Sequence, residues 1–218
     1  MPTSFEQVVQ SEGLRAFGLA DFLSMQLPKR ELLLSPWLPE KGLAMVFAQR
    51  GVGKTHLCLG IAHAVATGGS FLGWDAPKAR PVLLLDGEMP AASLQQRLAA
   101  ITALRSEEPP TGNLRILPYD FFELGGPDLS NEKGQAMLEP IIEDAALIVV
   151  DNISTICRVG KENEADSWTA MQAWGLSQRR KGRSVLFIHH AGKSGDQRGT
   201  SAREDVMDTV IKLSRSGG

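Results

Sequence analysis

Residues 48–55, with the sequence Ala-Gln-Arg-Gly-Val-Gly-Lys-Thr, constrain the fold of this chain more than any other segment. They follow a short apolar run, 43–48, and lead into a helical pattern of residues. A strand, a glycine-containing loop and a helix in this order form the context that a phosphate-binding Walker A loop requires. Gly51 and Gly53 allow successive backbone N–H groups to turn toward one centre, to which the helix adds its positive N-terminal end. Ala48 stands where the motif usually has its first glycine, and a residue this small is expected to be tolerated there.

The loop predicts a nucleoside triphosphate and a metal ion as ligands, so we expect ATP and Mg²⁺ to bind here. Lys54 is placed to reach the β- and γ-phosphates, and the hydroxyl of Thr55 is placed to ligate the metal. The residues of this loop expected to surround the nucleotide are Gln49, Arg50, Gly51, Val52, Gly53, Lys54, Thr55 and His56.

After the loop, short apolar runs alternate with longer helical stretches. The apolar runs lie at 43–48, 81–86, 113–117, 146–151, 184–189 and, more weakly, 210–213. The helical stretches lie at 54–66, 90–105, 132–142 and 166–180. Uninterrupted apolar runs are typical of strands covered on both faces, and strands that alternate with helices form crossover units. The pattern therefore predicts an α/β fold with a mainly parallel, twisted sheet flanked by helices, which binds its ligand at the carboxyl ends of the strands.

Polar side chains follow three of the apolar runs, at the ends where such a ligand would bind. Asp151 follows four apolar residues and is expected to hold magnesium as a Walker B aspartate. Glu88, just beyond the second run, is the expected base that orients an attacking water, and His190 is expected to lie near the γ-phosphate. Each of these residues taken alone is also compatible with a solvent-exposed strand end. His189 alternates with His190 along the strand, so it is expected to face the other side of the sheet.

Composition limits the remaining possibilities. Hydrophobic residues make up 43% and charged residues 22% of the 218 residues, which excludes a disordered chain and indicates a buried core. The formal net charge of −2 provides no global basic field for nucleic acid. Cys58 and Cys157 form no metal-binding or disulfide pattern and are expected to be reduced thiols. The N-terminus lacks a secretory pattern and the apolar runs are too short to span a membrane, so a cytoplasmic location without membrane association is expected.

Residues 1–40 are expected to form an N-terminal extension ahead of a single core domain at 41–218. Within the extension, 4–10 and 19–25 have the pattern of short amphipathic helices. The later part of the extension is rich in proline, which disfavours helical conformation in the residue before it. We therefore expect that part to be extended.

Six motifs occur along residues 40–215. They are Gly-Val-Gly-Lys-Thr at 51–55, Asp-Gly-Glu-Met-Pro at 86–90, Ile-Val-Val-Asp-Asn at 148–152, His-His at 189–190, Lys-Ser-Gly at 193–195 and Arg-Gly-Thr-Ser at 198–201. Together they resemble the RecA-like ATPase core, and more closely the RepA-type branch of hexameric replicative helicases. The resemblance implies a RecA-like P-loop NTPase core that hydrolyses ATP with Glu88 as catalytic carboxylate. It also implies active sites shared between neighbouring subunits of a homo-oligomer, a hexameric ring.

The same resemblance suggests roles for several basic residues. Arg215 lies seven residues after Asp208, the spacing at which related ring helicases carry an arginine finger that reaches the neighbouring subunit's nucleotide. Arg97 is expected either to pack near the nucleotide base or to be a solvated helix residue. In this family the loops after the fourth and fifth strands, here 153–167 and 191–202, line the central pore. The expected contacts to single-stranded DNA in these loops are Arg158, Lys161, Lys193 and Arg198. Ordinary flexible loops without such contacts are the alternative.

Three functions remain compatible with these features. The first is an ATP-driven motor on single-stranded DNA, a RepA-like replicative helicase or a related recombination ATPase. The second is a regulatory P-loop ATPase whose nucleotide-dependent assembly binds a protein partner. A nucleotide kinase is the third, and it is disfavoured because the chain shows no arginine-rich lid segment. Stimulation of ATP hydrolysis by single-stranded DNA would distinguish the first function from the second.

Overall fold

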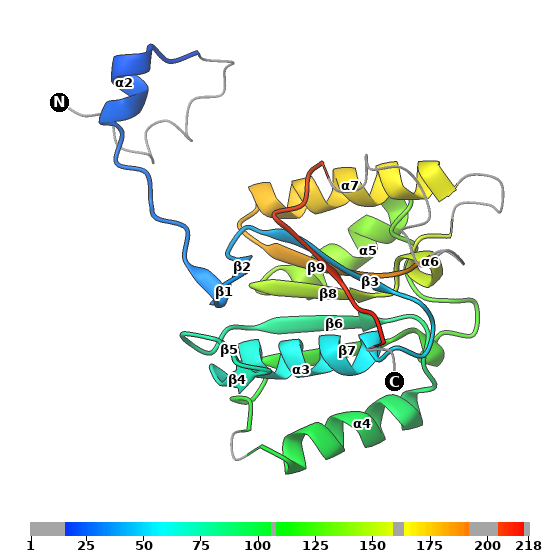
Figure 1. Ribbon diagram of the computed structural model, residues 1–218. Coiled ribbons are helices and arrows are strands. Elements are labelled where there is room, and N and C mark those ends of the chain that lie inside the picture. Colours follow the sequence, from blue (N-terminus) through cyan, green and yellow to red (C-terminus); the bar gives the residue numbers. More distant parts are fainter. Residues whose placement is uncertain (1–15, 106–107, 159–163, 192–204, 216–218) are drawn as a thin grey trace. The chain divides into compact units, whose positions relative to one another are not determined.

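The chain divides into two compact units, Met1–Glu31 and Leu32–Gly218. The computed structural model (Figure 1) describes residues 16–105, 108–158, 164–191 and 205–215. In the first unit, the helix predicted at 19–25 is confirmed as α2 (Leu19–Ser24), and none of its side chains is buried. The helix predicted at 4–10 lies outside the described residues.

The second unit begins earlier in the chain than the predicted core. Its first elements are β1 (Leu32–Leu34) and β2 (Leu38–Pro39), which pair antiparallel. Leu33, Leu34 and Leu38 are buried in the core of this unit, with exposed fractions of 1% or less. The predicted division at residue 40 therefore falls inside the second unit, since these leucines pack with the residues that follow it.

A six-stranded sheet forms the centre of the second unit, and all of its strand pairs are parallel. Its strands, in spatial order, are β10 (Thr209–Lys212), β3 (Leu43–Ala48), β9 (Ser184–His190), β8 (Leu147–Asp151), β6 (Val82–Asp86) and β7 (Leu114–Pro118). All six predicted strands are confirmed to within one residue at each end. Every residue of β3, β6 and β8 is buried, which explains why these segments are apolar without alternation.

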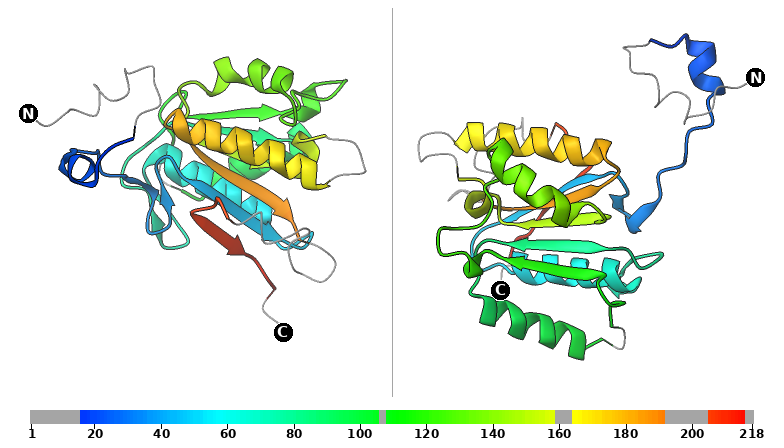
Figure 2. Two further views of the ribbon diagram at one scale, coloured as in Figure 1. Left: turned by 90° about the horizontal axis from the view of Figure 1, so that it is seen from above. Right: turned by 180° about the vertical axis from the view of Figure 1, so that it is seen from behind.

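Helices cover both faces of the sheet, as Figures 1 and 2 show. The helices are α3 (Lys54–Thr67), α4 (Ala91–Ala103), α5 (Glu132–Ile142), α6 (Ile153–Ile156) and α7 (Glu164–Arg180). Even-numbered residues of β3 and β6 pack with α3 and α4, whereas odd-numbered ones pack with α5 and α7. The core therefore has two apolar layers, one on each side of the sheet, as the alternation of strand side chains requires.

Smaller elements complete the second unit. β4 (Ser70–Phe71) and β5 (Trp74–Asp75) form a short hairpin after α3, and a 3-10 turn (Tyr119–Phe121) follows β7. Among the described residues, no helix combines the length and the apolar character needed to cross a membrane.

The parallel arrangement brings several polar strand ends to one edge of the sheet. Ala48 pairs with His190, and Asp86 pairs with Asp151, so the carboxyl ends of β3, β9, β8 and β6 lie next to one another. This edge carries the loop before α3 and is the place where open parallel sheets bind ligands.

Candidate active site

The loop between β3 and α3 wraps around the amine of Lys54. Gly51 and Gly53 have φ angles of 76° and 105°, in the left-handed region that favours glycine. The Lys54 Nζ donates hydrogen bonds of 2.9 Å to the carbonyl oxygens of Ala48 and Gln49. An ammonium group has three donors, so these two bonds leave one for an anion at the loop.

The charge of Lys54 is set by its surroundings. Its side chain is only 6% exposed, and this burial lowers its pKa, while the carboxylates of Glu88 and Asp151 partly oppose the shift. A buried ammonium that has no carboxylate within salt-bridge distance among the described residues is poised to bind a strongly anionic group.

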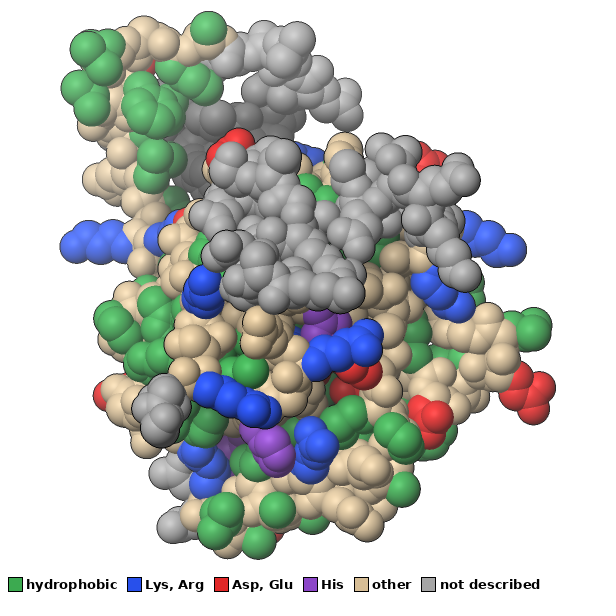
Figure 3. Space-filling view, turned by 45° about the vertical axis from the view of Figure 1, so that its right-hand side comes forward, with side chains coloured by type: hydrophobic (Ala, Val, Ile, Leu, Met, Phe, Trp, Pro, Cys, Tyr) green, Lys and Arg blue, Asp and Glu red, His purple; other side chains and the backbone are tan. Residues whose placement is uncertain are grey.

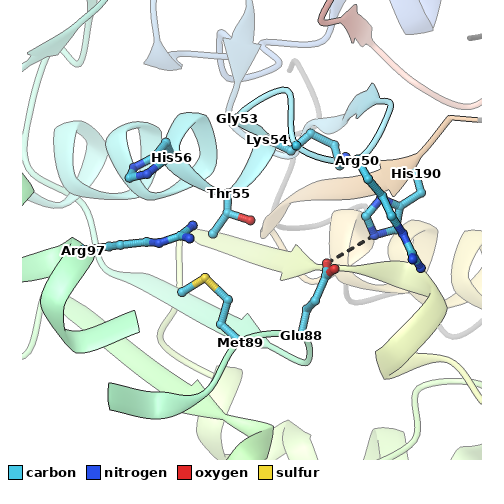
Figure 4. A pocket seen from close by; sticks show the side chains of 10 residues that line it. Arg50, Gly53, Lys54, Thr55, His56, Glu88, Met89, Arg97 and His190 are labelled. Atoms are coloured by element: carbon cyan, nitrogen blue, oxygen red, sulfur yellow. Dashed lines mark hydrogen bonds and ion pairs between the residues drawn. The ribbon is translucent and has the colours of Figure 1, made fainter. Parts of the chain in front are cut away.

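A cavity of about 520 Å³ lies beside this loop. It is lined by Arg50, Gly51, Gly53, Lys54, Thr55, His56, Glu88, Met89, Arg97 and His190. Figure 4 shows that these residues come from the loop, from the start of α3, from the turn after β6, from α4 and from the end of β9. On the face shown in Figure 3, histidine, basic and acidic side chains gather close together.

Most of the residues predicted to bind nucleotide line this cavity, with two exceptions. Val52 is half-buried and is not part of the lining. Gln49 takes part through its backbone, because its carbonyl oxygen holds the Lys54 amine. Met89 is a lining residue that the sequence patterns did not single out; its signal was its place directly after Glu88.

Asp151 lies at the end of β8 behind the cavity and is 1% exposed. The hydroxyl of Thr55 and, at 3.5 Å, the thiol of Cys58 donate to its carboxylate. Burial and the neighbouring carboxylate of Asp86 raise the pKa of Asp151 to about 6. Burial also raises the pKa of Asp86, whose Oδ2 is buried without a hydrogen-bond partner among the described residues.

These residues fit a magnesium ion. A hydroxyl oxygen and a carboxylate oxygen are ligands that Mg²⁺ prefers, and a divalent cation would offset the two adjacent buried carboxylates. Within the described parts of the chain, no cluster of three acidic, histidine or cysteine side chains could hold a metal ion unaided. Mg²⁺ usually binds through one or two side chains together with phosphates and water, and Thr55 and Asp151 could supply those side-chain ligands.

Glu88 reaches the opposite wall of the cavity and is held there by two side chains. Its Oε2 accepts a hydrogen bond of 2.5 Å from Asn152 Nδ2 and lies 3.2 Å from His190 Nε2, as Figure 4 shows for His190. Burial and the charge of Lys54 lower the pKa of His190, although Glu88 opposes this shift, so the imidazole is neutral at pH 7. Glu88 is therefore oriented by two neighbours without forming a permanent ion pair.

Asn152 is a site residue that the sequence did not reveal as a contact of Glu88. It is the N-cap residue of α6, and its backbone N–H donates to the Thr155 hydroxyl at 3.4 Å. The available signal was an asparagine directly after the Asp151 strand with a threonine three residues later, a pattern typical of a helix start. The contact with Glu88 depends on the pairing of β6 and β8.

Of the basic residues assigned from the resemblance, Arg97 lines the cavity and two others can be placed outside it. Arg215 follows β10, and its Nη2 donates to the Gly51 carbonyl oxygen of the same chain at 3.3 Å. Arg158 donates its guanidinium hydrogens to the carbonyl oxygens of Leu124 and Gly126. Lys161, Lys193 and Arg198 lie outside the described residues.

A second cavity, of about 660 Å³, adjoins the first and shares Glu88 and Met89 with it. Arg158 lines this cavity rather than an open loop. Phe122 lines this cavity, and it and its chain neighbours Phe121 and Leu124 have exposed fractions of 40%, 72% and 96%. An exposed aromatic side chain thus lines a cavity that also contains Glu88.

The chain was compared with known protein families, curated sequences and solved structures. A family model described as an AAA domain matches residues 10–196. No curated protein sequence matches the chain. The chain is similar in structure to the KaiC-like protein PH0186 from the hyperthermophilic archaeon Pyrococcus horikoshii OT3, with a TM-score of 0.55 over 82% of this chain and 73% of that one. The identity is 15%, so this likeness concerns the fold.

Two further solved structures show a weaker likeness. The flagellar accessory protein FlaH from Methanocaldococcus jannaschii is 12% identical, with a TM-score of 0.48 over 72% of this chain and 66% of that one. The RadB recombinase is 18% identical, with a TM-score of 0.47 over 69% of this chain and 62% of that one.

Proposed function

From the premise that this chain belongs to the AAA domain family and has a RecA-like P-loop ATPase fold, we propose that it hydrolyses ATP with Mg²⁺. One observation carries the proposal. The residues of the loop after β3, Thr55 and Glu88 line one cavity at the carboxyl edge of the sheet, and Thr55 is hydrogen-bonded to the buried Asp151. Phosphoryl transfer to water needs these three components and little covalent chemistry from the protein.

Each of these side chains has a separate role in the proposed hydrolysis. Lys54 and the backbone N–H groups of the loop hold the phosphates, while Thr55 and Asp151 hold the metal, which offsets phosphate charge when bound. Glu88 orients the attacking water and accepts its proton as the bond to the γ-phosphorus forms and the bond to the leaving oxygen breaks. His190 keeps Glu88 in place. Because water attacks the γ-phosphorus, the products are ADP and inorganic phosphate.

We propose further that the chain acts as a RepA-like replicative helicase or a related recombination ATPase on single-stranded DNA. The order and spacing of the six motifs support this role. In this proposal the active subunits form a cytoplasmic homo-oligomeric ring, in which Arg215 serves as the arginine finger. The contact of Arg215 with Gly51 places its guanidinium beside a phosphate loop, although within one chain.

A regulatory ATPase that binds a protein partner is the second candidate. The observation that favours it is the exposure of Phe122, which lines the second cavity, and of its chain neighbours Phe121 and Leu124. Patches of this kind on a folded domain mark interaction sites. A partner seated there would lie close to Glu88, since both cavities share this residue.

The two candidates differ in what stimulates hydrolysis. We expect single-stranded DNA to raise the ATPase rate and the particle mass to increase with a non-hydrolysable ATP analogue. DNA binding is expected to weaken steeply with salt and in Lys193→Ala and Arg198→Ala. If the assembled, analogue-bound protein shows no DNA binding at low salt, the helicase proposal is wrong and the regulatory ATPase is favoured.

Mixing of inactive variants tests the arginine finger separately. Arg215→Ala should keep nucleotide affinity and lose roughly 10³-fold or more in turnover. A Lys54→Ala subunit retains its arginine and an Arg215→Ala subunit retains its phosphate loop, so a mixture should regain activity if Arg215 acts between subunits. Wild-type turnover in Arg215→Ala would exclude the finger, and an inactive variant that mixing never rescues would exclude action between subunits.

A further inference from the structure

The turn that carries Glu88 is built on the preceding aspartate. Asp86 is the last residue of β6, and its side chain is 1% exposed. Its Oδ1 accepts hydrogen bonds from the backbone N–H groups of Met89 at 2.8 Å and of Glu88 at 3.2 Å. The turn after β6 is therefore closed by this one side-chain oxygen.

The remaining N–H group of the turn is held by the neighbouring strand. Gly87 donates to the carbonyl oxygen of Asp151 at 2.7 Å. Three successive backbone N–H groups, at residues 87, 88 and 89, are thus all bonded to the two aspartates that pair at the ends of β6 and β8. A turn with each of its donors bonded has little freedom to change conformation.

The turn also lies tightly against α6. A Cβ atom on Gly87 would stand 2.5 Å from Thr155 Oγ1 and 2.8 Å from Ile156 Cγ1, so the turn cannot shift toward this helix. Asn152, which caps α6, donates to the carboxylate of Glu88. Glu88 is therefore fixed at both ends, through its backbone by Asp86 and through its carboxylate by Asn152.

We propose that Asp86 is a positioning residue for Glu88, which acts through the turn and does not itself bind nucleotide or metal. The inference rests on the proposed role of Glu88 in ATP hydrolysis and adds a residue to it. Asp86 Oδ1 is occupied by the N–H groups of Glu88 and Met89, so its effect on the position of Glu88 passes through these two hydrogen bonds. A misplacement of a catalytic group by about 1 Å costs about 100-fold in rate.

The test compares substitutions that keep or remove the acceptor oxygen. Asp86→Asn retains an oxygen in the Oδ1 position and is expected to keep kcat within about threefold of the wild type, since neutral acceptors support such turns. Asp86→Ala removes the acceptor and is expected to lower kcat about 100-fold with the Kd for the Mg²⁺-bound ATP analogue nearly unchanged. In the Glu88→Gln background, Asp86→Ala is expected to cause no additional loss.

Asp128 supplies a matched control. Its Oδ1 also accepts two backbone N–H groups, from Ser130 at 2.8 Å and from Arg158 at 3.1 Å, but neither of these donors lines the first cavity, whereas Glu88 and Met89 do. Asp128→Ala removes an equivalent pair of bonds and is expected to lower the melting temperature without the loss of kcat. Nucleotide affinity and melting temperature, measured for every variant, report whether the protein is folded.

The outcomes separate this inference from the proposed function. A wild-type protein that does not hydrolyse ATP overturns both. With an active wild type, full activity in Asp86→Ala overturns the inference alone, as does a tenfold or greater loss of kcat in a folded Asp86→Asn protein. If Asp86→Ala fails to bind nucleotide, Asp86→Glu, which shifts the carboxylate, takes its place in the test. A lower kcat with retained nucleotide affinity in Asp86→Glu supports the inference, and an unchanged kcat overturns it.

Discussion

The amine of Lys54 is held by two carbonyl oxygens at 2.9 Å and is almost completely buried. Lys54→Ala removes the only cation buried in the described loop, so nucleotide affinity is expected to fall by roughly 100-fold or more, as for the loss of a charge-assisted contact. Titration with a fluorescent ATP analogue measures the change. Lys133→Ala, at an exposed position on α5, is the control. Equal affinity in the two variants would show that the loop does not bind the phosphates through Lys54.

The burial of the Asp151 carboxylate leads to a prediction about the stability of the metal-free protein. Its pKa is raised from 3.8 to about 6 in the folded state, so stability is lost as pH rises through this range and the carboxylate ionises. Asp151→Asn avoids the free-energy cost of ionising this buried carboxylate, which is roughly 3 kcal/mol above pH 6. With EDTA present, the variant is expected to melt at a higher temperature than the wild type at pH 8, with the difference shrinking toward pH 4.

The same variant is expected to lose Mg²⁺-dependent nucleotide binding, which calorimetry with and without magnesium measures. A higher melting temperature together with lost metal dependence in Asp151→Asn would show that Asp151 binds the ligand but destabilises the folded protein. A lower melting temperature in EDTA at pH 8 would contradict the account of Asp151.

Individual residues show what the sequence could and could not predict. Asp151, Glu88 and His190 could be predicted to lie near one another, because the ends of apolar runs converge at one edge of a parallel sheet. Asn152 was not assigned to Glu88, since that contact arises only when β6 and β8 pair. Arg158 was expected in a DNA-binding loop, but its guanidinium bonds to the carbonyls of a loop more than 30 residues earlier in the chain, which local sequence does not encode.

Three elements of one face, α5, α7 and β9, meet at Arg183. Its guanidinium, only 8% exposed, donates to Glu139 of α5 and to Gln178 of α7. Although burial opposes it, hydrogen bonds from Lys181 and Arg183 lower the pKa of Glu139, so its contribution is present above pH 4.5 and is lost as pH falls below it. Glu139→Gln is expected to reduce the free energy of unfolding by about 1 kcal/mol at pH 7, since Glu139 is partly exposed.

Urea unfolding at pH 7 and at pH 3.5 measures this contribution, and the difference between variant and wild type should shrink at the lower pH. Asp144→Asn is the control, because Asp144 pairs with Arg115 at a site where its side chain is 65% exposed. A pair this exposed contributes little. Equal losses in the two variants would show that the buried position of Arg183 does not matter.

At the level of elements, the strands of the central sheet and the helices between them were predicted well, and the β1–β2 pair was not. The helix at 132–142 was predicted with both of its ends correct, whereas the helix predicted at 90–105 runs from Ala91 to Ala103. Pro90 was expected to be its first residue, but it precedes the helix with an extended ψ of 134°. The small β1–β2 pair was missed, because its stability comes from three leucines packed in a distant core.

The division of the whole molecule at residue 31 leads to a prediction about truncation. A chain that lacks residues 1–31 is expected to melt within a few degrees of the full-length protein, since α2 has no buried side chain. A chain that lacks residues 1–40 also loses Leu33, Leu34 and Leu38, each worth about 2–5 kcal/mol when buried. This is comparable to the entire stability of a domain, so the shorter chain is not expected to fold.

Circular dichroism melting of the two truncated chains measures the difference. Equal melting temperatures would show that the hairpin before residue 40 does not belong to the core. Loss of folding in both would show that the first unit is required for stability, contrary to the division found here.

The central claim is that this molecule hydrolyses ATP with Glu88 as the group that activates water. The most direct measurement is phosphate release by the wild type and by Glu88→Gln, paired with the affinity of each for a Mg²⁺-bound ATP analogue. We predict release by the wild type, and in Glu88→Gln a loss of at least about 100-fold in kcat with affinity preserved, because the amide keeps the shape but cannot accept the proton. Hydrolysis by Glu88→Gln at the wild-type rate, or loss of its nucleotide affinity to the level of Lys54→Ala, would contradict the account.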